Sequence, residues 1–492
     1  MGSGGHQIKP IILDPSDPMA SARKMVGMHL SNPEGLRILH HYRGRFYLFT
    51  GSSYCAAQDG EVRNAIWKFL ENAKRNASIL NQGRATGTRV VSFKPSLTTV
   101  NNVAAALASV CEVPDELELP AWLPSFKGPG SDLPPHEFLA VPNGLLHVPS
   151  GELYSMTPAY FGLNASEVEF DPCAEAPTWG RFLQDLFVND AESVDTIMEW
   201  FGYVLTPDTS FQKGMFFIGP PRAGKGIISR TLRLLVGAKN VCSPTLSSFQ
   251  GEFGLQPLIG KLLATINDAR FSKRADPATV AERLLSITGQ DPISANRKNL
   301  SFWEGQLTTR FMILSNELPH FTDSSVALIK RFIVVQFTES WLGKEDATLE
   351  KRIHHELPGI LNWAMAGYRR LHKRGHFHQP ASAADAIQAM EDLASPIRAF
   401  VRDCCLIGPD HKEGVRVLFE RWEMWCDSQG QRYPGTVQQF GRQLRAAFPH
   451  IRMEQHPRRY VGVAVDTARL RAKAEEAAKN RPPGWKSFHG TQ

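Results

Sequence analysis

The chain has 492 residues, 42% of them apolar and 21% charged, and a formal net charge of only +6. This composition is typical of a soluble globular protein with two to four domains, and any basic surface must be local rather than global. No apolar run approaches the ~20 residues of a membrane span, so we expect no membrane partner. The seven cysteines are scattered and never spaced as C-x-x-C, which argues against a disulfide framework or a zinc cluster and favours a reducing cytoplasm.

Residues 1–115 are predicted to form an N-terminal α+β domain. The aromatic run 45–49 has the character of a strand, and residues 62–70 have helical spacing. We interpret these aromatic residues as core, the alternative being a surface on which nucleic-acid bases stack. No acidic pair on a strand suits a two-metal polymerase or primase site. The repeated prolines of residues 116–142 then indicate a linker or an irregular crossing segment.

Residues 143–210 are predicted to form a mainly helical subdomain ahead of the nucleotide-binding core. The stretch 143–153 has the pattern of a hairpin, and residues 179–187 and 191–205 have the pattern of two helices.

A glycine-rich loop follows the apolar run 214–218 and opens into a stretch with helical spacing that ends at Gly237. This order of strand, loop and helix is typical of a phosphate-binding loop. Backbone N–H groups and the helix N-terminus would bind the β- and γ-phosphates, and Lys225 would reach the terminal phosphates. The usual Ser or Thr after the lysine, a ligand of Mg²⁺, is replaced by Gly226. The predicted nucleotide contacts are Gly219, Pro220, Pro221, Arg222, Ala223, Gly224, Lys225, Gly226 and Ile227.

From residue 214 to about 337 strand and helix patterns alternate, which predicts a parallel α/β sheet. Asp268 follows a buried strand and would hold Mg²⁺ directly or through water. Because Ala269 stands where many nucleotide hydrolases have a second acid, the general base is unassigned. Asn316 ends another buried strand, 310–315, where it would orient the hydrolytic water near the γ-phosphate. The alternative for Asn316 is a turn residue at the end of a strand.

Two short strands, 293–295 and 300–303, enclose a polar tip that carries Arg297 and Lys298. A protruding tip with two cations suits the phosphates of a single DNA strand held in a channel. The alternative is a solvated hairpin with surface charges.

The order of these motifs, continued by Ser315 to Pro319 and Asp323 to Phe332, resembles the superfamily 3 helicases of the poxvirus and phage primase-helicase type over residues 140–385. The resemblance implies an AAA+ P-loop ATPase core at 211–385 that uses ATP and Mg²⁺. It also implies a ring, usually a hexamer, that pumps single-stranded DNA with 3'-to-5' polarity. In such a ring Arg331 would be the arginine finger for a neighbouring subunit. No primase domain is recognisable upstream, which leaves a separate primase or polymerase as a candidate partner.

Residues 395–466 show two helical stripes and then two short strands, 451–453 and 460–465, the pattern of a winged-helix domain. Residues 431–460 contain six arginines and only one acidic residue, Glu454, a composition that favours DNA contact. The alternative is a protein-docking domain with a solvated basic face. We expect the charged tail 467–492 to be mobile. The residues predicted to face a groove are Gln438, Arg442 and Arg445, and those predicted to face the DNA backbone are Arg458 and Arg459.

These features predict a replicative DNA helicase of a phage, plasmid or other mobile element that acts on single-stranded and on forked or origin DNA. One alternative is an origin-binding initiator that melts DNA. The other is an ATP-switched DNA-binding protein that does not unwind, a hypothesis that Gly226 and Ala269 favour. The sequence His376-Phe377-His378 resembles the metal-binding histidine pair of rolling-circle nickases, but we interpret it as linker or surface histidines.

Overall fold

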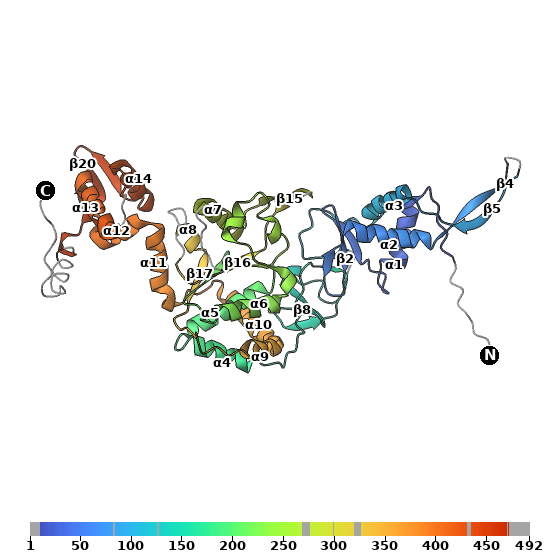
Figure 1. The fold of residues 1–492 in the computed structure, drawn as a ribbon, viewed down its shortest axis with the longest axis horizontal. Helices are drawn as coiled ribbons and strands as arrows, with labels where there is room; N and C mark the ends of the chain where they lie inside the picture. The colour runs from blue at the N-terminus through green and yellow to red at the C-terminus, as the bar shows by residue number, and fades with distance from the viewer. Residues whose placement is uncertain are drawn as a thin grey trace.

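A computed structural model describes residues 10–81, 84–124, 127–267, 276–298, 300–318, 326–430, 434–469 and 471. The chain is elongated, with the N-terminal domain at one end, an α/β core in the middle and the C-terminal domain at the other end (Figure 1). Among the helices of these residues, none is long and apolar enough to cross a bilayer.

The core is built on a five-stranded parallel sheet, which confirms the α/β class expected from the sequence. Its strand order is β12-β13-β16-β11-β17, and every neighbouring pair is parallel. All residues of β11 and β16 are buried, as expected for a parallel sheet that is covered on both faces. The strands are β11 (Gly214–Ile218), β12 (Val241–Cys242), β13 (Leu263–Asn267), β16 (Arg310–Ser315) and β17 (Phe332–Gln336).

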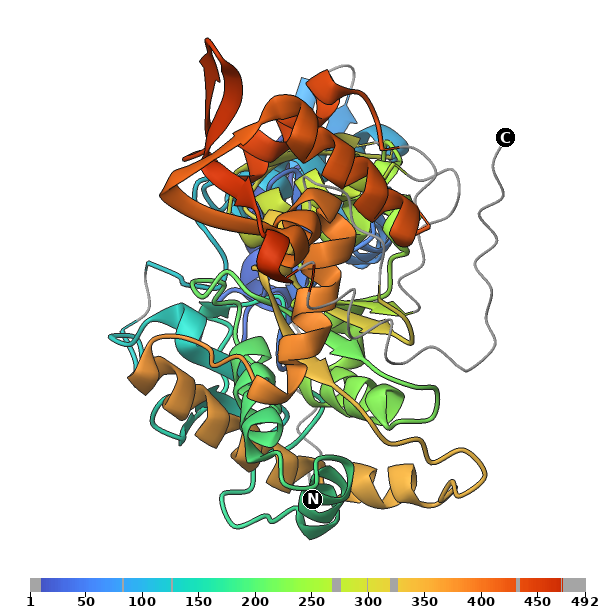
Figure 2. The same cartoon turned by 90° about the vertical axis from the view of Figure 1, so that its left-hand side faces the viewer.

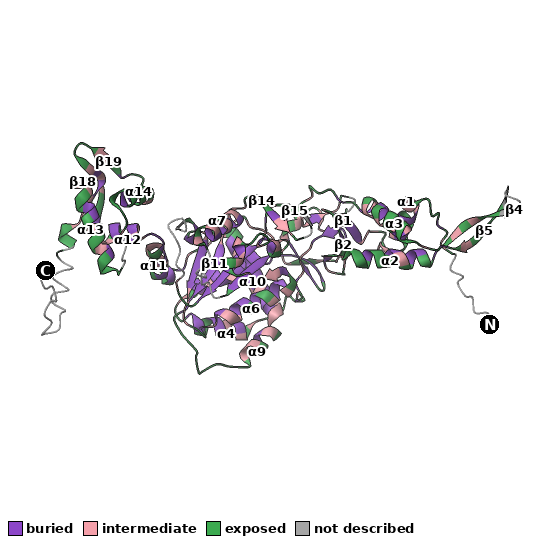
Figure 3. Cartoon of the chain, turned by 45° about the horizontal axis from the view of Figure 1, so that its top comes forward, coloured by how far each residue is buried: buried purple, intermediate pink, exposed green. Residues whose placement is uncertain are grey.

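Alternate residues of β11 enter two different cores. Met215 and Phe217 pack into a core with helices α5, α6 and α10, and Phe216 and Ile218 pack into a second core with α7, α8 and α11. The sheet therefore lies between two helical layers, and its strand β11 is drawn as buried in Figure 3. The helices are α5 (Ala191–Val204), α6 (Lys225–Val236), α7 (Pro277–Thr288), α8 (Val326–Ile329), α10 (Leu357–Arg374) and α11 (Ala384–Ala394).

The two helices predicted within 143–210 are observed as α4 (Pro177–Leu186) and α5, and they pack with α9 (Leu349–His355) and α10 from much later in the chain. The carboxylate of Glu356 accepts hydrogen bonds from the backbone N–H groups of Thr178 (2.9 Å) and Trp179 (3.0 Å), at the start of α4. These N–H groups have no partner inside their own helix, so Glu356 joins α4 to α10.

The hairpin predicted at 143–153 is confirmed as β8 (Gly144–His147) paired with β9 (Glu152–Tyr154). A third strand, β7 (Phe138–Val141), lies within the segment that the prolines indicated as a linker. All four of its residues are buried, and prolines on its amino-terminal side mask this short apolar run in the sequence. Residues 121–122 of the same segment form β6 (Ala121–Trp122), which pairs with β10 (Tyr160–Phe161).

The N-terminal domain has an α+β fold. Its core includes Ile66, Val100 and Leu107. In the aromatic run 45–49, Phe46 is buried, and Tyr47 and Phe49 are half-buried and pack against a small neighbouring core. The interpretation of these residues as core is supported. The helices are α1 (Pro18–His29), α2 (Asp59–Glu71) and α3 (Leu97–Val110). The strands are β1 (Leu39–Tyr42), β2 (Arg45–Phe49), β3 (Tyr54–Ala56), β4 (Lys74–Asn81) and β5 (Arg84–Ser92).

The C-terminal domain contains the two helices and the strand pair expected from its sequence (Figure 2). It also contains α12 and β18, which the sequence pattern did not indicate. Only Cys405 of β18 is buried, so this strand carries no alternating apolar pattern. Cys404 and Cys405 are buried in the domain core. The elements are α12 (Pro396–Cys404), β18 (Cys405–Gly414), α13 (Val415–Ser428), α14 (Val437–Ala447), β19 (Arg452–Gln455) and β20 (Arg458–Val465).

Close contact between α5 and α10 depends on two glycines. A Cβ added to Gly202 would lie 2.3 Å from the backbone nitrogen of Tyr368, and one added to Gly367 would lie 2.1 Å from the carbonyl oxygen of Met198. Both neighbours are backbone atoms, so neither can turn aside as a side chain would. The two helices can approach this closely only with glycine at both positions.

We therefore expect Gly202→Ala to destabilise the protein by about 1–3 kcal/mol, because the added methyl group overpacks a helix interface. Gly180→Ala, within α4, is the matched control. A Cβ there meets no atom within 4 Å, so the helix should gain about 0.5–1 kcal/mol. Chemical denaturation of both variants measures the difference. Equal stability of the two variants would contradict the close packing.

Candidate nucleotide site and nucleic-acid interfaces

The glycine loop connects β11 to α6 through three residues with positive φ. Gly219 has φ +153°, Arg222 +60° and Gly224 +83°. A Cβ on Gly219 would lie 2.3 Å from the carbonyl oxygen of Phe337, so only glycine fits where the loop leaves the sheet. Gly224 is the residue before α6 and has a left-handed conformation that favours glycine. The loop therefore turns tightly and places Lys225 at the first position of the helix.

Lys225 is only 7% exposed, and its ammonium group is fully engaged. The Nζ atom donates hydrogen bonds to the carbonyl oxygens of Gly219 (2.6 Å) and Pro220 (2.7 Å) and to Oδ1 of Asn316 (3.1 Å). Burial lowers the pKa of Lys225 from its ordinary value. The structure thus brings together two residues that the sequence analysis selected after two different strands, β11 and β16.

A cavity of about 920 Å³ opens beside this cluster. Residues 221–227 of the loop form one wall, and Asn267 and Asn316, at the ends of β13 and β16, form another. The rim includes Arg181 of α4 and, after β17, Trp341 and Lys344. This volume is in the range of small-molecule sites in proteins. Lys225 and Gly226 begin α6 beside the cavity, at the end of a helix where backbone N–H groups have no acceptor within the helix.

The acid predicted at the end of β13 cannot be placed. Asp268 and Ala269 lie outside the described residues, as do Asp323 and the tail beyond residue 471. The preceding residue, Asn267, lines the cavity, so the chain leaves β13 at the same edge of the sheet as the glycine loop. Gly226 also lines the cavity, and it offers no side-chain oxygen there.

Arg331 lies at the amino ends of the sheet strands, whereas the glycine loop lies at their carboxyl ends. Its carbonyl oxygen accepts a hydrogen bond from the N–H of Gly214 (2.8 Å), the first residue of β11. The loop begins after the last residue of that strand, about 16 Å away for a strand of five residues. The Arg331 guanidinium donates to Oε1 of Gln212 and lines a second cavity that Glu282 and Asp291 also border. The structure therefore does not bring Arg331 to the loop of its own chain.

The polar hairpin is formed by β14 (Ile293–Arg297) and β15 (Leu300–Gly305), which are antiparallel. Lys298 is exposed at the turn, and its backbone N–H donates to Oε1 of Gln256 (3.1 Å). Phe302 is 65% exposed on β15, and the sequence analysis did not select it. The strand alternation places Phe302 and Trp303 on opposite faces, and Trp303 packs against the second core. The alternation of the strand pattern was the sequence feature that could have indicated an exposed ring at Phe302.

The C-terminal basic residues lie partly on one helix face. Gln438, Arg442 and Arg445 are exposed on α14, and Phe440 and Leu444 on its other face are fully buried.

On the strand pair that follows, Arg458 is exposed, whereas Arg459 forms an ion pair with Glu454 at 2.5 Å. Lys412 of β18 contacts the same carboxylate at 3.3 Å. Hydrogen bonds from Arg459 and Lys412 hold the pKa of Glu454 below its usual value. The positive charge of Arg459 is thus partly neutralised, which the sequence did not indicate. Arg432 lies outside the described residues.

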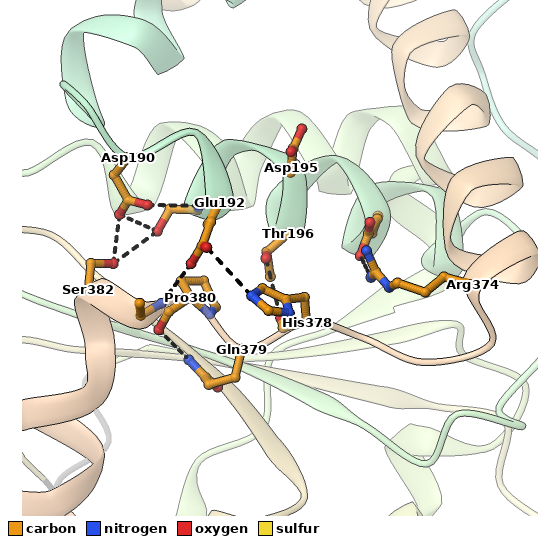
Figure 4. Close-up of polar contacts among 12 residues, drawn as sticks. Asp190, Glu192, Asp195, Thr196, Arg374, His378, Gln379, Pro380 and Ser382 are labelled. Atoms are coloured by element: carbon orange, nitrogen blue, oxygen red, sulfur yellow. Dashed lines mark hydrogen bonds and ion pairs between the residues drawn. The ribbon is translucent and has the colours of Figure 1, made fainter.

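The histidine pair lies in the connection between α10 and α11. His378 contacts Glu192 of α5 at 3.6 Å (Figure 4). Nδ1 of His376 contacts the backbone oxygen of Arg374. Over the part of the chain that the structure describes, no group of three or more His, Cys, Asp and Glu residues could hold a metal ion. Their position between two helices agrees with the interpretation as linker or surface histidines.

The same connection fastens α5 to the edge of the sheet. Gln379 accepts from the N–H of Val334 in β17 (3.0 Å) and donates to its carbonyl oxygen (2.7 Å). Three residues further on, Ser382 donates to Asp190 at the start of α5 (2.7 Å) (Figure 4). The free edge of β17 is thereby covered by a side chain that imitates a neighbouring strand.

Two protein families match parts of the chain. Residues 131–188 match a family described as D5 N terminal like, and residues 217–331 match a family of unknown function, DUF5906. The first match covers β7 to β9 and α4, and the second runs from β11, just before the glycine loop, to Arg331. An uncharacterized mitochondrial protein of Marchantia polymorpha, ymf21, is 26% identical over 99 residues, which are 19% of this chain. The chain spans about half (55%) of the length of that relative.

Among solved structures, the apo C-terminal region of NrS-1 (305–718) is similar over 91% of this chain and 99% of its own, with a TM-score of 0.50 and 13% identity. An A-form apo structure of the same region has a TM-score of 0.47 and 14% identity, over 91% of this chain and 100% of its own. The first likeness shows that the fold is shared over most of the chain.

Proposed function

We propose that this chain is an ATP-driven DNA helicase that serves replication of a phage, plasmid or other mobile element. The observation that carries the proposal is the position of Lys225. Its ammonium group lies in a cavity at the carboxyl edge of a parallel sheet, beside Asn316 and at the N-terminus of a helix. The D5 N terminal like match supports a role in replication.

ATP is the ligand that fits this site best. The carbonyl oxygens of Gly219 and Pro220 now accept the hydrogen bonds of Lys225, and phosphate oxygens would replace them as stronger acceptors. The N–H groups at the start of α6 and the helix dipole favour negative charge at the same place. In this proposal the contacts run from Gly219 to Ile227, and the cavity of about 920 Å³ has room for the nucleoside.

Magnesium would be held by Asp268 and by water, because Gly226 provides no hydroxyl ligand. When bound, the ion neutralises phosphate charge. Asn316 is fixed by the hydrogen bond that its Oδ1 accepts from Lys225. Its amide NH₂ group would then position the attacking water near the terminal phosphate.

Assembly into a ring would explain the position of Arg331. A guanidinium at the opposite edge of the sheet cannot serve its own loop, but it can serve the loop of a neighbouring subunit, where it would stabilise transition-state charge. We therefore propose a homo-oligomer, in keeping with the hexamer that the resemblance implies.

DNA contacts would come from two surfaces. Arg297 and Lys298 at the hairpin tip would bind the phosphates of a single strand, and exposed Phe302 offers a ring on which a base can stack. We propose that the motor moves along that strand with 3'-to-5' polarity. The C-terminal domain, proposed as a winged helix, would place the ring on forked or origin DNA, and a separate primase or polymerase would complete the machinery in the cytoplasm.

One observation favours a second function. The exposed face of α14 carries Gln438, Arg442 and Arg445, a set suited to base edges as well as phosphates. An origin-binding initiator would use this face to select a sequence. Binding that distinguishes one duplex sequence from its shuffled version would favour the initiator over a general helicase.

We expect Lys225→Ala to weaken binding of a fluorescent ATP analogue by about 10- to 100-fold, since a charged hydrogen bond contributes roughly 1.5–3 kcal/mol. Lys344→Ala is the matched control, because Lys344 lies on the rim of the same cavity but is exposed. Its removal should change the affinity less than threefold. Equal losses in the two variants, measured by fluorescence titration, would contradict the site.

The Arg331 assignment can be tested by mixing inactive chains. We expect Lys225→Ala and Arg331→Ala each to lower ATP hydrolysis, the latter by about 10³-fold. An equimolar mixture should recover part of the wild-type rate, because some interfaces then combine an intact loop with an intact arginine. Mixing Lys225→Ala with the K225A/R331A double variant is the control and should recover nothing. No recovery in the first mixture would show that Arg331 does not act across subunits.

A further inference from the structure

The N-terminal domain carries a two-stranded arm, which we call the β4–β5 ribbon (residues 74–81 and 84–92). Its two strands pair antiparallel from Lys74 opposite Ser92 to Ile79 opposite Gly87 and form a sheet of their own. They project beyond α1, α2 and α3 at the end of the molecule (Figure 1). At its base the ribbon is anchored, because Leu13 N–H donates to the carbonyl oxygen of Lys74 (2.8 Å) and the next residue after β5, Phe93, is buried in the domain core.

The ribbon and the residues that follow it in the sequence carry only positive charges. Residues 72–111 contain no Asp or Glu, and their five cationic residues are Lys74, Arg75, Arg84, Arg89 and Lys94. In the antiparallel register Arg75 stands opposite Val91, and Arg89 stands opposite Ala77. The two arginines are therefore diagonal neighbours on one face. Among the described residues neither arginine forms an ion pair with a carboxylate, so their charge is not neutralised locally.

The ribbon is also slender. Ala77, Ser78, Gly87 and Thr88 are small, so little side-chain bulk surrounds the backbone in the stretch beyond the arginines. Ile79, on the same face as Arg75 and Arg89, is 44% exposed. No Phe, Tyr or Trp occurs between residues 74 and 92.

We propose that the β4–β5 ribbon binds duplex DNA, with Arg75 and Arg89 on the phosphates and the narrow part of the ribbon in the major groove. The major groove of B-form DNA is wide enough for a two-stranded β-ribbon. A single strand is a poorer partner, because sequence-independent single-strand sites combine cations with aromatic stacking platforms. Double-stranded RNA is poorer too, because its major groove is deep and narrow.

This contact needs neither ATP nor the motor, so it goes beyond the proposed helicase function and can fail or succeed separately. It would give the chain a hold on duplex DNA at the end of the molecule opposite to the C-terminal basic domain (Figure 1). A protein that grips duplex at one domain and a single strand at its core hairpin is suited to a junction between the two.

The test is the affinity of the full chain, without nucleotide, for a labelled blunt-ended duplex as a function of salt concentration. We expect R75A/R89A to weaken binding by about tenfold near 0.1 M salt and to lower the slope of log K against log salt by about 1.8, because each lost phosphate contact removes about 0.9. R75K/R89K keeps both charges and should bind within a few-fold of wild type.

The matched control is R23A/R63A, which removes the same charge from exposed positions on α1 and α2 of the same domain. It should leave duplex binding and its salt slope nearly unchanged. An equal loss in this control, or no loss in R75A/R89A, would overturn the proposal. The proposal would also be overturned if R75A/R89A weakened binding to single-stranded DNA but not to the duplex. It would likewise be overturned if the variant changed only self-association, measured by sedimentation. The same variants made in an R442A/R445A background measure duplex binding without the contribution of α14.

Discussion

The structure of the core depends on one buried cation. Lys225 begins α6, and its ammonium group satisfies two carbonyl oxygens of the preceding loop and the amide oxygen of Asn316 from a different strand. A charge in this position is costly unless it is hydrogen-bonded, and burial accordingly lowers its pKa. The loop must therefore turn tightly enough to present its carbonyls, which is why glycine is required at 219 and 224. The same arrangement leaves a cationic site ready for an anionic ligand.

The parallel sheet imposes a second constraint, because residues at the carboxyl ends and at the amino ends of its strands cannot contact the same phosphate. The glycine loop and Asn316 lie at the carboxyl edge, and Arg331 lies at the amino edge, where it bonds to Gln212. If both belong to one reaction, two subunits must meet, and a single chain would be an incomplete enzyme.

Much of this architecture could be predicted from local sequence. The apolar strand before Gly219 and the helical spacing after Lys225 determine the loop, and the alternation around Arg297 determines the hairpin. What could not be predicted depends on contacts between distant segments. The strand 138–141 is hidden among prolines, and β18 has no apolar alternation, so both are stabilised by neighbouring strands rather than by local preference. The ion pair of Arg459 with Glu454 likewise depends on the register of β19 and β20. The composition of the segment indicates the two charges but not that they are paired.

In the proposed function, nucleotide turnover at Lys225 drives movement along a DNA strand. The most direct measurement is ATP-dependent displacement of a labelled strand from forked DNA that carries either a 3' or a 5' single-stranded tail. We expect displacement that requires the 3' tail and is abolished by Lys225→Ala. Hydrolysis of ATP without displacement on either fork would contradict it and would favour a nucleotide-switched DNA-binding protein.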